Sequence, residues 1–296
     1  MLTILGKSGC GKSTLLKCIY GLVDLQKGEI NFNNEKVLGP SFNLIPGYPH
    51  FKLVSQESVL LENCTVEENI KDQLYGYTNE YKSSRTDEVL LAVDLKKHAQ
   101  KKANLLSSGQ RQRLCIARAI TEFPKLLLLD EPFSNLDFNR RDCLFAFIRK
   151  NLEQHNSSCI YITHHPQEAI RYAHQLMVIE DGKMVAYGNP ELIYKKPESA
   201  AIARLFGTAY LLEKNLFTTS KSLHTIKDKC LIRPEQLFLT EEKNKKFPQL
   251  SGVVEAFYFS GYRYDIQVRL NSRNTVCFSH HEALPEKSKI TLGIYN

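Results

Sequence analysis

Hydrophobic residues in the first two thirds of this chain fall into short continuous runs, separated by stretches whose apolar positions recur with a helical period. Apolar runs of about four to eight residues suit strands that are buried inside a sheet. Helical stretches between such strands predict a parallel sheet, so the chain is expected to have an α/β fold. The predicted strands cover residues 2–5, 51–56, 125–132 and 159–163.

Two sequences have the pattern of a capping box, in which serine or threonine is followed three residues later by glutamate or glutamine. Thr65 with Glu68 predicts a helix start, and a mostly helical stretch follows to about residue 100. Ser107 with Gln110 predicts a second helix start. The free N–H groups in the first turn of that second helix would attract an anion.

The last third of the chain has a different pattern, with short strands separated by polar breaks after a helix at 200–206. Apolar and polar residues alternate strictly over 264–270, so one face of that strand is expected to be buried in a small β-barrel. The other strands predicted in the last third are 231–233, 237–239, 253–259, 275–278 and 289–294.

In the first two thirds of the chain, hairpins are predicted at Asn33-Asn34 and at Asp181-Gly182.

These patterns predict two domains. Residues 1–208 would form the α/β domain, with a helical subdomain at about 62–122, and residues 209–296 would form the small all-β domain. A length of 296 residues with 43% hydrophobic residues is enough for two cores.

Composition limits the partners that this chain is expected to have. No apolar run approaches the roughly 20 residues that cross a bilayer, so a membrane role would have to come from a partner. The net charge is +7, but the basic residues are scattered and lack interleaved aromatic residues. We therefore expect solvated basic faces and no nucleic-acid partner.

The eight cysteines include no C-x-x-C pair, and most stand in apolar or helical surroundings, as do Cys18, Cys115, Cys143 and Cys159. This favours reduced, buried thiols in a cytoplasmic protein. Cys10 differs because it lies in a glycine-rich turn before a helix, where a lowered thiol pKa would promote oxidation. The preferred interpretation is a small residue that the turn tolerates.

That turn carries the sequence GKSGCGKST, which fills the pattern G-x-x-x-x-G-K-[ST]. Glycine lets the backbone turn with its N–H groups inward, and the following helix adds partial positive charge, so the turn suits phosphate oxygens. Lys12 is expected to hold the β- and γ-phosphates of a nucleotide, and Ser13 to ligate Mg²⁺. The nucleotide-binding residues predicted here are Gly6, Lys7, Ser8, Gly9, Cys10, Gly11, Lys12, Ser13 and Thr14.

Polar residues stand at the ends of the later strands. Asp130 and Glu131 follow four leucines, and a buried parallel strand delivers such acids to the carboxyl edge of the sheet, where α/β proteins bind ligands. Gln56 ends one strand and His164 follows another. Glutamine or histidine at a strand end is commonly inert, so the residue type alone leaves a structural role open for both.

The order of these motifs resembles that of the nucleotide-binding subunits of ATP-binding cassette (ABC) transporters. The motifs span most of residues 1–190 in the family's order and approximate spacing. The signature motif is the most specific, because other phosphate-loop proteins lack it. Residues 6–14 are similar to the Walker A motif, Gln56 to the Q-loop glutamine, LSSGQ (106–110) to the signature, LLLLDEP (126–132) to Walker B, SNLD (134–137) to the D-loop, and His164 to the switch histidine.

The resemblance implies ATP hydrolysis that depends on Mg²⁺. The metal would be held by Ser13, Gln56 and Asp130. Glu131 would polarise the attacking water, and His164 would contact the γ-phosphate. For His165, where the family often carries aspartate, we expect no catalytic role.

The resemblance also implies partners, because in this family the signature helix does not reach the phosphates of its own chain. Ser107, Gly109 and Gln110 would bind the ATP of a second copy, or of a paralogous ATPase, in a head-to-tail dimer. Hydrolysis would drive integral membrane permease subunits through the surface near Gln56, with an extracytoplasmic solute-binding protein as an indirect partner. The protein would then be peripheral, at the cytoplasmic face of the inner membrane.

The tail resembles a TOBE domain, an oligonucleotide-binding-fold-like domain found in ATPases of binding-protein-dependent importers. The similarity lies in FGTAYLLEKN (206–215) and LIRPEQLFLT (231–240), and it is strongest to iron(III), polyamine and related anion or thiamine systems. An importer ATPase, with iron(III) or polyamine as solute, is therefore the leading interpretation. The alternatives are a non-transport ABC ATPase of DNA repair or translation, and an ATP-gated interaction module.

Two features depart from the family pattern. The second glycine of the signature is Ser108 here, so its contacts are expected to depend on Ser107 and Gly109. The family also has a strand pair and an adenine-stacking aromatic residue upstream of the Walker A strand, whereas this sequence begins at that strand. On this sequence we expect weak ATP affinity and poor solubility, since adenine would be held loosely and a sheet edge left bare.

Overall fold

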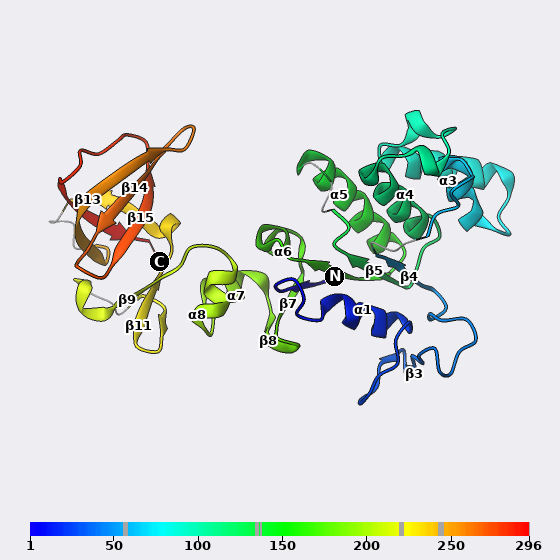
Figure 1. Cartoon of the computed structure of the whole chain (residues 1–296), viewed down its shortest axis with the longest axis horizontal. Helices are drawn as coiled ribbons and strands as arrows, with labels where there is room; N and C mark the ends of the chain where they lie inside the picture. Colours follow the sequence, from blue (N-terminus) through cyan, green and yellow to red (C-terminus); the bar gives the residue numbers. More distant parts are fainter. Residues whose placement is uncertain (56–58, 134–135, 137, 219–221, 242–245, 296) are drawn as a thin grey trace. The chain divides into compact units, whose positions relative to one another are not determined.

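The structure is a computed structural model, and it describes all residues except 56–58, 134–135, 137, 219–221, 242–245 and 296 (Figure 1). The chain divides into two compact units, residues 1–190 and 191–296. The boundary predicted near residue 208 lies later in the chain than this division. The difference arises because Ala203 packs against Ile226 and Leu231, which belong to the second unit.

The first unit is built on a six-stranded sheet with the order β4-β5-β6-β1-β7-β8. Neighbouring strands are parallel except for β8, which runs antiparallel to β7. The predicted α/β class is therefore confirmed. The strands are β1 (Leu2–Leu5), β4 (Phe51–Val54), β5 (Leu126–Asp130), β6 (Ser158–Thr163), β7 (Gln175–Glu180) and β8 (Lys183–Gly188).

Helices connect these strands, and both predicted capping boxes are present. The N–H of Glu68 donates to Oγ1 of Thr65 at 3.1 Å, and the N–H of Thr65 donates back to the Glu68 carboxylate at 2.6 Å. Ser107 and Gln110 form the same reciprocal pair at the start of α4. The helices and 3₁₀ turns of this unit are α1 (Lys12–Tyr20), α2 (Val66–Lys71), η1 (Asp72–Leu74), α3 (Asn79–Ala92), η2 (Lys96–His98), η3 (Ala103–Leu105), α4 (Ser108–Thr121), α5 (Phe138–Gln154) and α6 (Pro166–Tyr172).

The leucines of β5 explain why this sheet is buried on both faces. Leu126 and Leu128 point to one face, where they share a core with Leu16 of α1. Leu127 and Leu129 point to the other face and belong to the core that includes α4 and α5. A continuous apolar run therefore serves two layers of helices, and Figure 1 shows α1 and the α4–α5 pair on opposite sides of the sheet.

Both predicted hairpins of the first unit are present. β2 (Asn31–Phe32) pairs with β3 (Glu35–Lys36), and Asn33 and Asn34 between them have φ values of 50° and 67°. The Asp181-Gly182 turn, which joins β7 to β8, also has positive φ at both residues. Two positive φ values are typical of the type I′ turns that connect hairpin strands.

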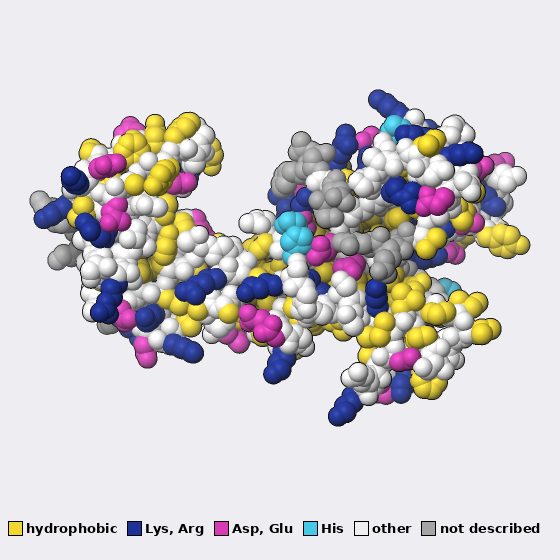
Figure 2. Space-filling model, viewed as in Figure 1, with side chains coloured by type: hydrophobic (Ala, Val, Ile, Leu, Met, Phe, Trp, Pro, Cys, Tyr) yellow, Lys and Arg dark blue, Asp and Glu magenta, His cyan; other side chains and the backbone are white. Residues whose placement is uncertain are grey.

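The loop that follows β3 exposes hydrophobic side chains. Phe42, Leu44 and Ile45 are largely exposed, and Figure 2 shows hydrophobic side chains gathered over this part of the first unit. Contiguous apolar surface of this kind favours association with other molecules.

The second unit begins with two short helices and continues as antiparallel sheet. One sheet has three strands, in the order β10-β11-β9, and the other has five, in the order β12-β16-β13-β14-β15. The edge strands β12 and β15 contact each other, so the larger sheet curls towards closure. The elements are α7 (Pro190–Lys195), α8 (Ala200–Leu205), β9 (Tyr210–Glu213), η4 (Lys214–Leu216), β10 (Thr225–Ile226), β11 (Lys229–Ile232), η5 (Pro234–Gln236), β12 (Leu237–Thr240), β13 (Gln249–Phe259), β14 (Tyr264–Arg269), β15 (Thr275–His280) and β16 (Lys289–Ile294).

All eight cysteines are free thiols, but most of them are not buried. Burial is complete for Cys159, whose pKa it raises to about 12. Cys18 and Cys115 are half-buried, and Cys143 on α5 is exposed. The predicted burial of Cys143 is therefore wrong, because a helical position does not itself say which face of the helix meets the core.

In the part of the chain that the structure describes, no helix combines the length and the apolar character needed to cross a bilayer.

Candidate functional site

The glycine-rich turn between β1 and α1 has a path that requires glycine at two points. A β-carbon on Gly6 would lie 2.4 Å from the carbonyl oxygen of Ile179, so β7 leaves no room for a side chain. Gly11 has a φ of 96° and directly precedes α1, which starts at Lys12. The free N–H groups in the first turn of α1 therefore face the turn, as an anion site requires.

Lys12 is held inside this turn, with 5% of its surface exposed. Its Nζ donates to the carbonyl oxygens of Gly6 at 2.9 Å and Lys7 at 2.8 Å, and lies 3.8 Å from Sγ of Cys10. A buried ammonium group needs such acceptors, because an unpaired buried charge is costly. Phosphate oxygens that enter the turn would compete for the same three N–H donors.

A hollow of about 400 Å³ opens beside the turn and reaches the carboxyl end of β5. There Asp130 accepts a hydrogen bond from Ser13. Burial raises the pKa of Asp130, and the charge of Glu131 adds to that effect, while the hydrogen bond from Ser13 opposes it. The residues that line the hollow are Ser8, Gly9, Gly11, Lys12, Ser13, Thr14, Lys17, Ser55, Asp130 and Glu131.

The donor set of Ser13 and Asp130 fits Mg²⁺, which prefers oxygen ligands. Mg²⁺ usually takes one or two protein ligands and completes its shell with waters and phosphate oxygens. Among the described residues no group of three or more His, Cys, Asp or Glu side chains could hold a metal without such help. Gln56, the third predicted ligand, lies outside the described residues, as do three of the four residues of SNLD.

Glu131 and His164 meet at the edge of the hollow because β5 and β6 are parallel neighbours that end together. Nδ1 of His164 lies 2.9 Å from Oε1 of Glu131. The backbone of Glu131 has a φ of 48°, in the left-handed region, and its N–H donates to the carbonyl oxygen of Ile162 at 3.1 Å. Figure 2 shows histidine and acidic side chains next to one another on the visible face of this unit.

The start of α4 is a separate site within one chain. Ser107 is exposed and caps the helix, and its N–H donates to Oε1 of Gln110 at 3.0 Å. Nε2 of Gln110 lies 3.0 Å from Nε2 of His98, which holds that side chain beside the helix. Ser107, Gly109 and Gln110 are not among the described residues that line the hollow.

Three residues near the hollow were not predicted from the sequence. Lys17 lines it from α1, four positions after Ser13, so the helical spacing was an available signal. Ser55 lines it directly after β4. Nε2 of Gln112 donates to the carbonyl oxygen of Glu131 at 3.1 Å, and no local pattern indicates that contact.

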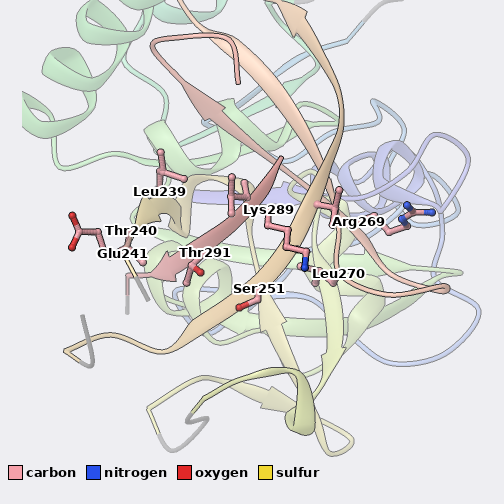
Figure 3. A pocket seen from close by; sticks show the side chains of 11 residues that line it. Leu239, Thr240, Glu241, Ser251, Arg269, Leu270, Lys289 and Thr291 are labelled. Carbon is pink, nitrogen blue, oxygen red and sulfur yellow. The ribbon is translucent and has the colours of Figure 1, made fainter. Parts of the chain in front are cut away.

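A larger hollow of about 790 Å³ lies in the second unit, on one face of the five-stranded sheet (Figure 3). Ser251, Thr291 and Lys289 project from neighbouring strands into it, and Nε of Arg269 lies 3.2 Å from the carboxylate of Glu255. Among the described residues, this lining has no pair of acids next to a buried lysine of the kind found in the first unit. The smaller hollow is therefore the candidate active site.

Comparisons with known proteins agree with that choice. The family model described as ABC transporter matches residues 1–134. The chain is 31% identical over 289 residues to the Fe(3+) ions import ATP-binding protein FbpC 2 of Haemophilus influenzae, with 92% of this chain and 80% of that protein covered. It is 30% identical over 303 residues to the spermidine/putrescine import ATP-binding protein PotA of Clostridium novyi, with 94% and 83% covered.

A solved structure is also similar. It is a dimeric, post-hydrolysis state of the ATP-binding cassette MJ0796 bound to ADP and Pi, with a TM-score of 0.57 and 27% sequence identity. The similarity covers 64% of this chain and 85% of that one. The segment that the family model matches contains Lys12, Asp130 and Glu131, all of which line the hollow.

Proposed function

Since this chain belongs to the ABC transporter family and is an ATPase of the importer type, we propose that two copies of it bind two ATP molecules between them. Each nucleotide would lie between the phosphate loop of one copy and the start of α4 of the other. The family assignment made from the sequence is confirmed by relatives that match more than nine tenths of the chain.

One observation carries the proposal of a head-to-tail dimer. The hollow beside Lys12 has donors for the phosphates and acids for metal and water, whereas the exposed helix start at Ser107 is not part of its lining. Two half-sites on one chain become whole sites when two copies pair reciprocally. The similar ATP-binding cassette with ADP and Pi is itself dimeric, which supports pairing of two copies.

In the proposed reaction each residue acts on a charge or a proton. Lys12 and the N–H groups of α1 would hold the β- and γ-phosphates. Ser13 and Asp130 would hold Mg²⁺, which when bound neutralises phosphate charge. Glu131 would orient the attacking water and accept its proton, while His164 would hold the carboxylate of Glu131 and contact the γ-phosphate.

We infer the transport partners from the relatives. Proteins named for Fe(3+) import and for spermidine/putrescine import match this chain along most of its length, so iron(III) or a polyamine is the proposed solute. The dimer would act as a peripheral subunit on membrane permease subunits, at the cytoplasmic face. The antiparallel second unit would be the TOBE-type domain.

The proposal is tested with Glu131→Gln, which keeps the shape of the side chain but removes its basicity. Hydrolysis is expected to fall by at least about 100-fold, because general-base catalysis usually contributes that much. ATP with Mg²⁺ should then hold the variant as a dimer, measured by light scattering. Glu153→Gln, on the exposed side of α5, is the matched control and should hydrolyse ATP like the wild type.

A variant that stays monomeric with saturating ATP and Mg²⁺ would contradict the dimer. A variant that hydrolyses ATP at the rate of the wild type would contradict the role of Glu131.

A further inference from the structure

The backbone at Glu131 has a conformation that a residue with a side chain rarely adopts. Its φ of 48° lies in the left-handed region, where the β-carbon crowds the backbone. Such a conformation persists only when neighbouring groups hold it, and it is concentrated at functional sites. The groups that hold Glu131 therefore decide where its carboxylate points.

Contacts from different elements hold this residue. The sheet supplies one, since the N–H of Glu131 donates to the carbonyl oxygen of Ile162 on β6 at 3.1 Å. The residue after β6 supplies the second, the 2.9 Å contact between His164 and the carboxylate. The helical region supplies the third, since Nε2 of Gln112 donates to the carbonyl oxygen of Glu131 at 3.1 Å.

The third contact differs from the others because of the helix on which it lies. Gln112 is half-buried near the start of α4, the helix capped by Ser107. Less than one and a half turns of this helix therefore separate the exposed cap from the side chain that binds the peptide group of Glu131.

We propose that Gln112 is a positioning residue for ATP hydrolysis, which holds the left-handed backbone of Glu131 so that its carboxylate faces the hollow. This rests on the proposed role of Glu131 and adds a link to the dimer. When the start of α4 binds the nucleotide of the partner subunit, Gln112 moves with that helix and adjusts Glu131 of its own chain. Hydrolysis at one nucleotide is thereby made sensitive to binding at the other.

Two nearly isosteric variants test the hydrogen bond. Gln112→Met keeps the length of the side chain and removes the N–H donor, whereas Gln112→Glu replaces the donor with a carboxylate that repels the carbonyl oxygen. The loss of one neutral hydrogen bond that orients the base is expected to lower kcat about tenfold for Gln112→Met. The loss should be larger for Gln112→Glu. KM and the Kd for ATP should stay within about twofold, because Gln112 does not line the hollow.

The matched control is Gln154→Glu, which makes the same chemical change at an exposed position near the end of α5. It should leave kcat unchanged. Each Gln112 variant, combined with Glu131→Gln, should still form the ATP-bound dimer, because the bond serves the reaction and not nucleotide binding.

The inference is overturned if Gln112→Met has the kcat of the wild type. It is also overturned if kcat, ATP affinity and Tm all fall together, since that result indicates only a packing role. Should wild-type protein bind ATP without hydrolysing it, the role of Glu131 fails along with this one. Failure of the role of Glu131 is distinguishable from failure of the role of Gln112, because it is seen with the wild-type protein before any variant is made.

Discussion

At the scale of single residues, the hollow holds one buried charge that its neighbours stabilise, on Lys12, and one charge that burial and a neighbouring acid disfavour, on Asp130. Lys12 is buried but surrounded by carbonyl oxygens, and Asp130 is partly buried beside a second acid, Glu131. Burial raises the pKa of Asp130 above that of an aspartate in water, so its charged form is disfavoured in the free protein. The charged form of Asp130, which would bind a metal, therefore lowers the stability of the folded protein.

The first prediction follows from that cost. Between the ordinary pKa of aspartate, about 3.9, and its raised value, the folded protein binds more protons than the unfolded chain, so rising pH lowers stability. Asp130→Asn removes the effect, and we expect its Tm without nucleotide to exceed that of the wild type at pH 7. The difference should shrink as the pH falls towards 4. Mg²⁺-dependent ATP binding should be lost in the same variant.

Asp142→Asn is the control, and its change in Tm at pH 7 is expected to have the opposite sign. The hydroxyl of Tyr172 and the guanidinium of Arg171 lower the pKa of Asp142, so its charge stabilises the fold above the ordinary pKa. This variant should have a lower Tm than the wild type at pH 7. Thermal unfolding followed by circular dichroism between pH 4.5 and 8 measures the Tm of both variants and of the wild type. A lower Tm for Asp130→Asn at pH 7 would contradict the argument.

At the scale of elements, two helices begin with the same capping box but differ in the role proposed for the helix start. The capping boxes of Thr65 on α2 and Ser107 on α4 satisfy N–H groups that a helix start leaves unpaired. Of the two, only α4 starts at the proposed contact with a second subunit's ATP. Local sequence therefore specifies the helix start, whereas a role in binding a partner's nucleotide depends on the proposed dimer.

The second prediction separates the contribution of each cap to stability from a contribution to ATP hydrolysis. Thr65→Ala and Ser107→Ala each remove a cap that is typically worth about 1 kcal/mol, so both should lower Tm by roughly 2–4 °C. Only Ser107→Ala should also reduce ATP hydrolysis, by about tenfold, because the hydroxyl would contact the partner's nucleotide. Steady-state hydrolysis and thermal unfolding of both variants provide the measurement. Equal hydrolysis rates in the two would argue against a role for Ser107 at the interface.

At the scale of the whole molecule, the parallel sheet gathers residues that are distant in sequence. β1, β5 and β6 run in the same direction, so the phosphate loop, the acids at 130–131 and His164 meet at one edge. The signature helix start remains outside that edge within one chain. A second copy is therefore required to complete each proposed site.

Mixed dimers test this requirement. Lys12→Ala damages the phosphate loop, and Gly109→Asp places a carboxylate where the partner's phosphates would lie. Either variant alone should be inactive, because every site then has one damaged half. A mixed dimer has one intact site, so an equal mixture should regain up to about one quarter of wild-type hydrolysis. Absence of any recovery, when exchange of subunits is verified by fluorescence energy transfer, would contradict sites shared between copies.

Much of the fold and part of the site could be predicted because their signals are local. The glycine pattern at 6–14, the two capping boxes and the paired Asn33-Asn34 turn act over a few neighbouring residues, and each is present where it was predicted. The exposure of Cys143 and the division of the chain at residue 190 were not predicted. Both depend on which surfaces pack against each other.

The sequence by itself determined the glycine-rich turn, the two capping boxes and the buried strand that ends in two acids, because periodicity and backbone restrictions are properties of adjacent residues. The tertiary structure alone decided the left-handed backbone of Glu131 and its bond from Gln112, and it decided that Ser55 lines the hollow. These features arise where separate elements meet in space. Only the packing of α4 and the parallel strands brings those groups within hydrogen-bonding distance.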